Sequence, residues 1–292
     1  MKVGVFAPIQ SPHCDREYLR VVGTETEAQG YHSLWLGEHV VLFDEYGSSY
    51  PYATDGKIPV AGERALLEPF TTLGFLAAVT ERIRLGTGIC LVPQRNPVYT
   101  AKETANIDWI SNGRLDFGVG IGWLEEEFKA LDMPYARRAD RCRSFLEVIK
   151  RLWCDDLSAY EDEFYNLPPC RQYPKPLQKP HPPIHFGGES DAALRRVADL
   201  GQGWYGFNLS PEAFAERVLR LEELLQARGR SLDDVEITVS PYMHPVTPDD
   251  LPRYAEAGAD QIVLMVLAGE PERYCARLEA ATRAYLEPAA EL

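Results

Sequence analysis

The feature that most constrains this chain is a regular alternation of strand-like and helix-like segments along its whole length. Eight short apolar or β-branched runs are each bounded by Gly, Pro, Asp or Ser, which is typical of buried strands. They cover Val3–Ala7, Ser33–Leu36, Ile83–Leu91, Leu115–Val119, Pro183–Phe186, Trp204–Phe207, Val235–Val239 and Gln261–Val266.

Amphipathic stretches with a period near 3.6 residues lie between these runs and predict helices. They cover Glu17–Gln29, Phe70–Thr80, Tyr99–Ile110, Arg141–Trp153, Asp191–Leu200, Ala213–Arg228, Leu251–Ala257 and Pro271–Leu286. Eight strands that alternate with eight helices predict parallel pairing, because the return between two parallel strands needs a crossover helix. The count favours an α/β fold, one closed (β/α)8 TIM barrel over residues 1–292, rather than an open doubly wound sheet.

Two long segments interrupt the alternation. Val40–Leu67 follows the second predicted strand and is rich in aromatic and turn residues. Because loops after the strand ends surround the catalytic face of a barrel, this insert is expected to be a lid or a substrate wall; a solvated loop on the outside is the alternative. Asp155–Pro182 contains six prolines and is expected to be an extended loop without regular structure.

Charge and apolar runs exclude several classes of partner. The formal net charge is −14, which is the wrong sign for a protein that binds nucleic acid or an anionic membrane surface. The apolar runs are strand-sized, far shorter than the roughly 20 residues of a membrane helix. The chain leads directly into a strand without a signal peptide, so we expect a cytoplasmic protein whose partner is a small organic molecule.

Cysteine and histidine spacing gives no sign of a metal site. The six cysteines lie far apart and form no Cys-x-x-Cys pair, so they are expected to be reduced thiols. His181 and His185 are four residues apart, but Pro182 and Pro183 between them forbid the helix that would bring both rings to one face. We expect no metal.

In a barrel, the residues that follow each strand build the active site. Glu38 and His39 end the second predicted strand. A histidine there is suited to transfer a proton or to stabilise developing charge, with a loop-bonding or capping histidine as the alternative. Gly187, Gly188 and Ser190 precede a predicted helix, which is typical of a phosphate-binding turn, although a plain tight turn has the same pattern.

Glycines also follow the fourth predicted strand, at positions 118, 120 and 122. They do not match the dinucleotide pattern G-x-G-x-x-G, because Trp123 stands where the third glycine is needed. Small residues at this place let a flat group approach the backbone, and Trp123 is placed to stack on it. No nucleophile elbow, Walker loop or zinc-protease motif is present.

Taken together and in order, six short motifs resemble those of the luciferase-like flavin and deazaflavin oxidoreductases. They are Ser33–His39, Leu85–Ile89, Arg95–Pro97, Ser111–Leu115, Gly120–Phe128 and Gly187-Gly188. The resemblance runs from residue 3 to about residue 207. The sequence Gly-Trp-x-x-x-Glu-Phe at Gly122–Phe128 is most similar to the subgroup that uses coenzyme F420.

The resemblance implies a (β/α)8 barrel with a tricyclic ring at its carboxyl-terminal mouth. Family members commonly have a bulge or a non-prolyl cis peptide at the position of Thr87, Gly88 and Ile89. It further implies that His39 and Glu38 are the catalytic residues. The implied cofactor-binding residues are Thr87, Gly88, Ile89, Gly122, Trp123, Glu127, Gly187, Gly188 and Ser190.

The expected activity is hydride transfer between coenzyme F420 and an organic substrate held under the insert. Two alternatives stay open: an FMN-dependent monooxygenase of the same fold, and a cofactor-binding protein without turnover. Family members are often dimers. The apolar residues of Tyr99–Ile110 and Arg141–Trp153 are candidates for an interface or for barrel packing.

Overall fold

The structure is a computed structural model that describes residues 1–10, 14–60, 62, 64 and 66–292. Of the predicted insert, residues 61, 63 and 65 lie outside this range. Eight of its strands correspond to the eight predicted runs. They are β1 (Lys2–Phe6), β2 (Ser33–Leu36), β3 (Arg84–Thr87), β5 (Leu115–Gly120), β8 (Ile184–Gly187), β9 (Gly203–Phe207), β10 (Glu236–Ser240) and β11 (Gln261–Met265).

These eight strands form one closed parallel barrel. Their order is β3, β2, β1, β11, β10, β9, β8 and β5, and a further pairing between β3 and β5 closes the ring. In that pairing Leu85 lies opposite Leu115 and Gly86 opposite Asp116. The predicted closed (β/α)8 barrel is therefore confirmed, and the open sheet is excluded.

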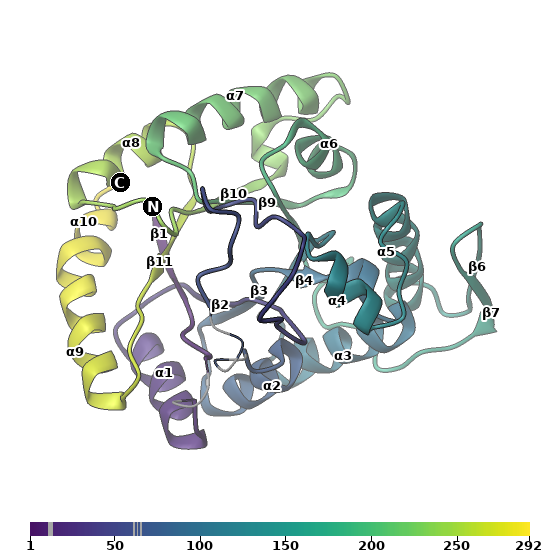
Figure 1. Ribbon diagram of the computed structural model, residues 1–292, viewed down its shortest axis with the longest axis horizontal. Coiled ribbons are helices and arrows are strands. Elements are labelled where there is room, and N and C mark those ends of the chain that lie inside the picture. Colours follow the sequence, from purple (N-terminus) through teal and green to yellow (C-terminus); the bar gives the residue numbers. More distant parts are fainter. Residues whose placement is uncertain (11–13, 61, 63, 65) are drawn as a thin grey trace.

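Helices surround the barrel on its outside (Figure 1). The chain ends lie close together there, where the Met1 amino group donates to the Ala289 carbonyl at 2.8 Å. The helices are α1 (Arg16–Ala28), α2 (Pro69–Val79), α3 (Pro97–Ile110), α4 (Glu125–Ala130), α5 (Arg138–Cys154), α6 (Asp191–Leu200), α7 (Pro211–Gln226), α8 (Leu251–Glu256), α9 (Pro271–Ala281) and α10 (Glu287–Ala289).

The strands are buried on both faces, which is why they appear in the sequence as continuous apolar runs. Side chains between barrel and helices form the main core, and Trp35, Tyr205 and Val263 pack together as a second apolar cluster. On α5 the apolar side chains belong to the core, whereas Tyr99 and Ile110 of α3 are exposed. Packing thus accounts for the apolar pattern of α5, and on α3 it accounts for Ala101, Ala105 and Ile107 but not for Tyr99 and Ile110.

Three local predictions are corrected. The predicted strand over residues 83–91 is divided, because β3 ends at Thr87 and a short strand β4 (Cys90–Leu91) follows it. The helix predicted over residues 271–286 ends at Ala281 and continues as one π-helical turn, Thr282–Leu286. The proline-rich segment contains an antiparallel hairpin of β6 (Ser158–Glu161) and β7 (Asn166–Cys170). Pro168 and Pro169 fall where its pairing register is irregular.

None of the helices in the described part of the chain is long and apolar enough to span a membrane.

Candidate active site at the carboxyl end of the barrel

The end of β3 carries an unusual backbone. The peptide bond between Gly88 and Ile89 is cis, in the segment where the resemblance implied a bulge or such a bond. The Ile89 side chain then lies across the neighbouring strand ends: a Cβ atom at Gly120 would stand 2.1 Å from Ile89 Cδ1, and one at Gly187 would stand 2.6 Å from it. A larger residue at either position would therefore force the Ile89 side chain to move.

Thr87, just before this bond, is fully buried, and its hydroxyl donates to the Gly118 carbonyl at 2.6 Å. The Thr87 side chain thus joins the ends of β3 and β5. Its predicted contact with a cofactor stays a prediction.

Glu38 and His39 follow β2 and contact different partners, as expected for neighbours on an extended backbone. The buried Glu38 carboxylate accepts the Leu91 N–H at 2.5 Å and pairs with the Arg95 guanidinium. Burial raises the pKa of Glu38, and Arg95 opposes that effect. Glu38 therefore ties β2 to the segment after the cis bond, a contact that sequence reasoning did not identify.

His39 is held by Glu127 of α4. The His39 Nδ1 atom lies 3.1 Å from Glu127 Oε2, and Glu127 Oε1 accepts the Val40 N–H at 2.7 Å. Gln94 Nε2 donates to the same carboxylate at 3.2 Å. Glu127 is completely buried. Its oxygens bond His39, Val40 and Gln94, which fixes the orientation of the imidazole. The cofactor contact that the resemblance implied for Glu127 stays a prediction.

Aromatic rings surround His39 on the side of the insert. The Trp123 ring lies 5.8 Å from the His39 ring and 5.1 Å from the Tyr50 ring, both edge to face. Tyr46 contacts the same indole at 5.7 Å. The insert therefore lies on the mouth of the barrel, in agreement with a lid or wall and not with a loop on the outside; Figure 1 shows it as the dark-blue trace within the ring of helices.

The turn after β8 has the geometry of an anion-binding turn. Gly188 has φ +103°, a conformation that glycine adopts readily. Ser190 is the N-cap of α6, and its hydroxyl accepts the Ala193 N–H at 3.2 Å. The helix N-terminus therefore lies directly behind Gly188, as the sequence predicted.

Glu189, between these residues, was not identified from the sequence. Its Oε1 atom accepts the Phe207 N–H at 2.9 Å, and its Oε2 atom accepts the Tyr52 hydroxyl at 3.0 Å. Burial raises the pKa of Glu189 to about 7, against the effect of these two hydrogen bonds. The one signal in the sequence was that a carboxylate stands within a turn whose neighbouring residues, Gly188 and Ser190, are suited to bind an anion.

The rim of the mouth fits a flat ring with a phosphate-bearing chain. The strand ends carry glycine at positions 120, 187 and 188, the Ile89 side chain lies over the first two, and the Trp123 ring contacts His39. Buried polar atoms without a partner in the described structure include Gln94 Oε1, on the side chain that donates to Glu127, and Tyr205 Oη, near Gly88. Each buried polar group without a partner calls for an explanation, and a bound ligand at the mouth is one explanation for these two.

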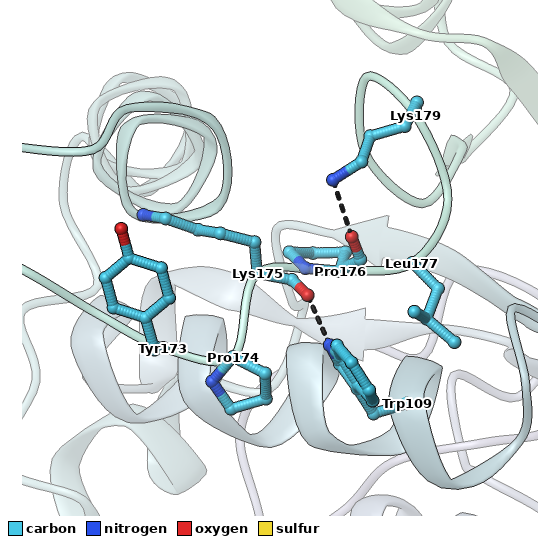
Figure 2. Close-up of a pocket in the computed structure, with 7 residues that line it drawn as sticks. All are labelled: Trp109, Tyr173, Pro174, Lys175, Pro176, Leu177 and Lys179. Atoms are coloured by element: carbon cyan, nitrogen blue, oxygen red, sulfur yellow. Dashed lines mark hydrogen bonds between the residues drawn. The ribbon is translucent and has the colours of Figure 1, made fainter.

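A pocket of about 590 Å³ lies elsewhere, at the C-terminal end of α3 (Figure 2). A proline-rich loop over residues 173–179 and Trp109 line it. Figure 2 shows that its polar groups are already used: the Trp109 indole donates to the Lys175 carbonyl, and Lys179 Nζ donates to the Pro176 carbonyl at 2.9 Å. The C-terminal end of a barrel helix points to the opposite face from the strand ends, so this pocket is separate from the mouth.

Among the residues that the structure describes, no group of three His, Cys, Asp or Glu side chains is arranged to hold a metal ion.

Comparison with known proteins decides the family. The model of the luciferase-like monooxygenase family matches residues 1–290. The chain belongs to this family. An uncharacterized protein of Mycobacterium tuberculosis is 32% identical to it over 248 residues, which is 85% of each chain. The resemblance drawn from the six motifs is therefore confirmed, and the protein is a luciferase-like oxidoreductase.

Solved structures with the same fold include proteins named for two different cofactors. The coenzyme F420-dependent tetrahydromethanopterin reductase of Methanopyrus kandleri matches with a TM-score of 0.76 at 17% identity, over 98% of both chains. The oxygenating constituent of 3,6-diketocamphane monooxygenase from Pseudomonas putida, solved with FMN, matches with a TM-score of 0.76 at 13% identity. That match covers 100% of this chain and 98% of the other. At these identities the likeness is one of fold.

Proposed function

We propose that this protein transfers a hydride between coenzyme F420 and an organic substrate at the barrel mouth. The single observation that carries the proposal is that the carboxyl end of the barrel holds the contacting His39 and Trp123 rings, the glycines that end β5 and β8, and the N-terminus of α6. The sequence Gly122–Phe128, which resembles the F420-dependent subgroup, supports the choice of cofactor. The deazaflavin ring, when bound, would supply the hydride chemistry.

The residues of the chain supply orientation and electrostatics. Gly187, Gly188 and Ser190 would hold the phosphate, since free backbone N–H groups and the helix dipole favour an anion there. Trp123 would lie against the ring. His39, with its Nδ1 atom directed to Glu127, presents Nε2 as the atom able to give or take a proton at the substrate.

The second candidate is an FMN-dependent monooxygenase, which the FMN-containing relative of the same fold supports. The two cofactors differ in one ring atom: a deazaflavin lacks the nitrogen that lets a reduced flavin react readily with oxygen. A binding experiment with both cofactors distinguishes the two candidates.

Titration of the purified protein with coenzyme F420 and with FMN, followed by fluorescence, tests the proposal. We expect F420 to bind more tightly than FMN by about tenfold or more, which is a difference of about 1.4 kcal/mol. The opposite preference would favour the monooxygenase. Binding without reduction of the cofactor by any of a broad panel of donors would favour a carrier without turnover.

A further inference from the structure

The insert over residues 40–60 is held across the mouth at three places. At its start, Val40 N–H donates to Glu127, the carboxylate that also binds His39. In its middle, Gly47 N–H and the Ser48 hydroxyl each donate to Glu126 of α4 at 2.7 Å. These two contacts fix the insert only on the side of β5 and α4.

The third contact fixes it on the opposite side, at the ends of β8 and β9. The Tyr52 hydroxyl donates to Glu189, and the Tyr52 carbonyl accepts from Asn208 Nδ2 at 3.1 Å. The Tyr52 ring also packs edge to face on Phe207, with 4.9 Å between the centroids. A single residue of the insert thus joins two strand ends.

This third contact positions a continuous row of rings. The Tyr50 ring lies 5.4 Å from the Tyr52 ring and 5.1 Å from the Trp123 ring, and Trp123 contacts His39. Aromatic pairs at such distances each contribute about 0.5–1.5 kcal/mol beyond the area they bury. A shift of Tyr52 would therefore move the wall that faces His39.

Glu189 is an unusual residue to hold such a wall. Glu38 is paired with Arg95, and Glu127 faces His39. Glu189, in contrast, is paired with no cationic side chain in the described part of the chain, and its partners are the neutral Tyr52 hydroxyl and the Phe207 N–H. An uncompensated, largely desolvated carboxylate costs stability. Because the Glu189 oxygens are directed to Tyr52 and Phe207, their negative charge would repel an anionic substrate on that side of the mouth.

We propose that Tyr52 and Glu189 are positioning and specificity-determining residues of the substrate site: they fix the aromatic wall opposite His39 and select neutral ring-bearing substrates against carboxylates of the same shape. The inference rests on the proposed function, because it concerns the substrate of that reaction. The substrate class that follows is a neutral, ring-bearing organic compound.

The first test concerns position. In Tyr52→Phe the ring stays and the hydroxyl is lost, so we expect hydrogen exchange in residues 44–56 to become about tenfold faster, as local opening becomes easier. The matched control is Tyr160→Phe, which removes a hydroxyl that donates to Asp162 at 2.8 Å in the exposed β6–β7 hairpin. Unchanged exchange in Tyr52→Phe, or an equal change in the control, would overturn the assignment of Tyr52.

The second test concerns charge. Calorimetry at about pH 8, where 2-naphthol is neutral and 2-naphthoate is an anion, compares two probes of the same ring size. We expect the protein to bind 2-naphthol about tenfold more tightly, and Glu189→Gln to bring the two affinities close together. Equal affinities in the unmodified protein, an unchanged ratio in Glu189→Gln, or no binding of either probe would overturn the assignment of Glu189.

The same samples separate this inference from the proposed function. Titration of Tyr52→Phe with coenzyme F420 and FMN reports on the rim and the α6 turn, because Tyr52 belongs to neither. If a cofactor binds, but hydrogen exchange is unchanged in Tyr52→Phe and the probe affinities are unchanged in Glu189→Gln, only the present inference is refuted. Altered exchange and probe preference without binding of either cofactor would refute the proposed function instead.

Discussion

Glu189 gives the sharpest quantitative prediction, because its replacement by glutamine removes one partly buried titrating group and keeps its shape. In the folded chain burial raises the pKa of Glu189 from 4.5 to about 7. The folded state therefore binds this proton more tightly than the unfolded state does. Stability that depends on Glu189 is complete below the unfolded pKa and falls as the pH rises through the folded pKa.

The magnitude follows from these two values. The full shift corresponds to a loss of about 3 kcal/mol, at 1.36 kcal/mol for each pKa unit. Between about pH 5.5 and about pH 8 the linkage relation gives a loss of about 2 kcal/mol from this group alone. Glutamine does not titrate, so Glu189→Gln should not lose this stability as the pH rises. Its free energy of unfolding, relative to that of the unmodified protein, should therefore increase by about 2 kcal/mol between about pH 5.5 and about pH 8.

Urea unfolding at the two pH values, followed by circular dichroism, measures the difference. Both values lie above the sequence pI of about 4.9, so the protein keeps a net negative charge throughout. Glu126→Gln is the control of opposite sign: hydrogen bonds from Ser48 and from backbone N–H groups lower the pKa of the exposed Glu126 carboxyl, so its contribution is lost as the pH falls. A difference between Glu189→Gln and the unmodified protein that does not change with pH would refute the reasoning.

Four further predictions concern catalysis, packing and assembly. His39→Ala should lower turnover by more than about tenfold and leave cofactor affinity within a few-fold; unchanged turnover would remove His39 from the mechanism. Glu127→Gln should also lower turnover, and the double variant should be no slower than His39→Ala alone, because Glu127 acts through the imidazole; additive losses would contradict this. Arg114→Met should lower the free energy of unfolding by about 3 kcal/mol or more, because the Arg114 guanidinium donates to the Ala77, Thr80, Ile83 and Ser111 carbonyls. Urea unfolding measures this change, and a smaller decrease would show that solvent replaces those hydrogen bonds. We expect a homodimer through α3, because the side chains of Tyr99 and Ile110 are 72% and 58% exposed there. Light scattering should give a mass of twice 32.9 kDa, and the double variant Tyr99→Ser, Ile110→Ser should have the monomer mass. A monomer mass for the unmodified protein would exclude this interface.

The barrel was predictable because its strands are buried on both faces and its helices on one, so each kind of element has a distinct apolar pattern. The β6–β7 hairpin was not, since Pro168 and Pro169 suggested a loop. Proline has no backbone N–H to donate to a neighbouring strand, but where the pairing is irregular no such hydrogen bond is required. The hairpin can therefore contain Pro168 and Pro169. Helix α4, with six residues, is too short to display a helical period.

The candidate site was predictable where position along a strand determines the role. His39 and Gly188 were found because each directly follows a strand. The partners were not: Glu127 is 88 residues from His39, and Glu189 is 137 residues from Tyr52. Which way these carboxylates point depends on how α4 and the insert pack on the mouth, and no local pattern encodes that.

A crystal structure of the protein soaked with coenzyme F420 tests the central claim most directly. We predict the tricyclic ring at the carboxyl end of the barrel, beside Ile89 and Trp123 and within reach of His39, with the phosphate at Gly188 and the N-terminus of α6. A ring bound in the pocket beside Trp109, or a mouth that stays empty at saturating cofactor, would contradict it.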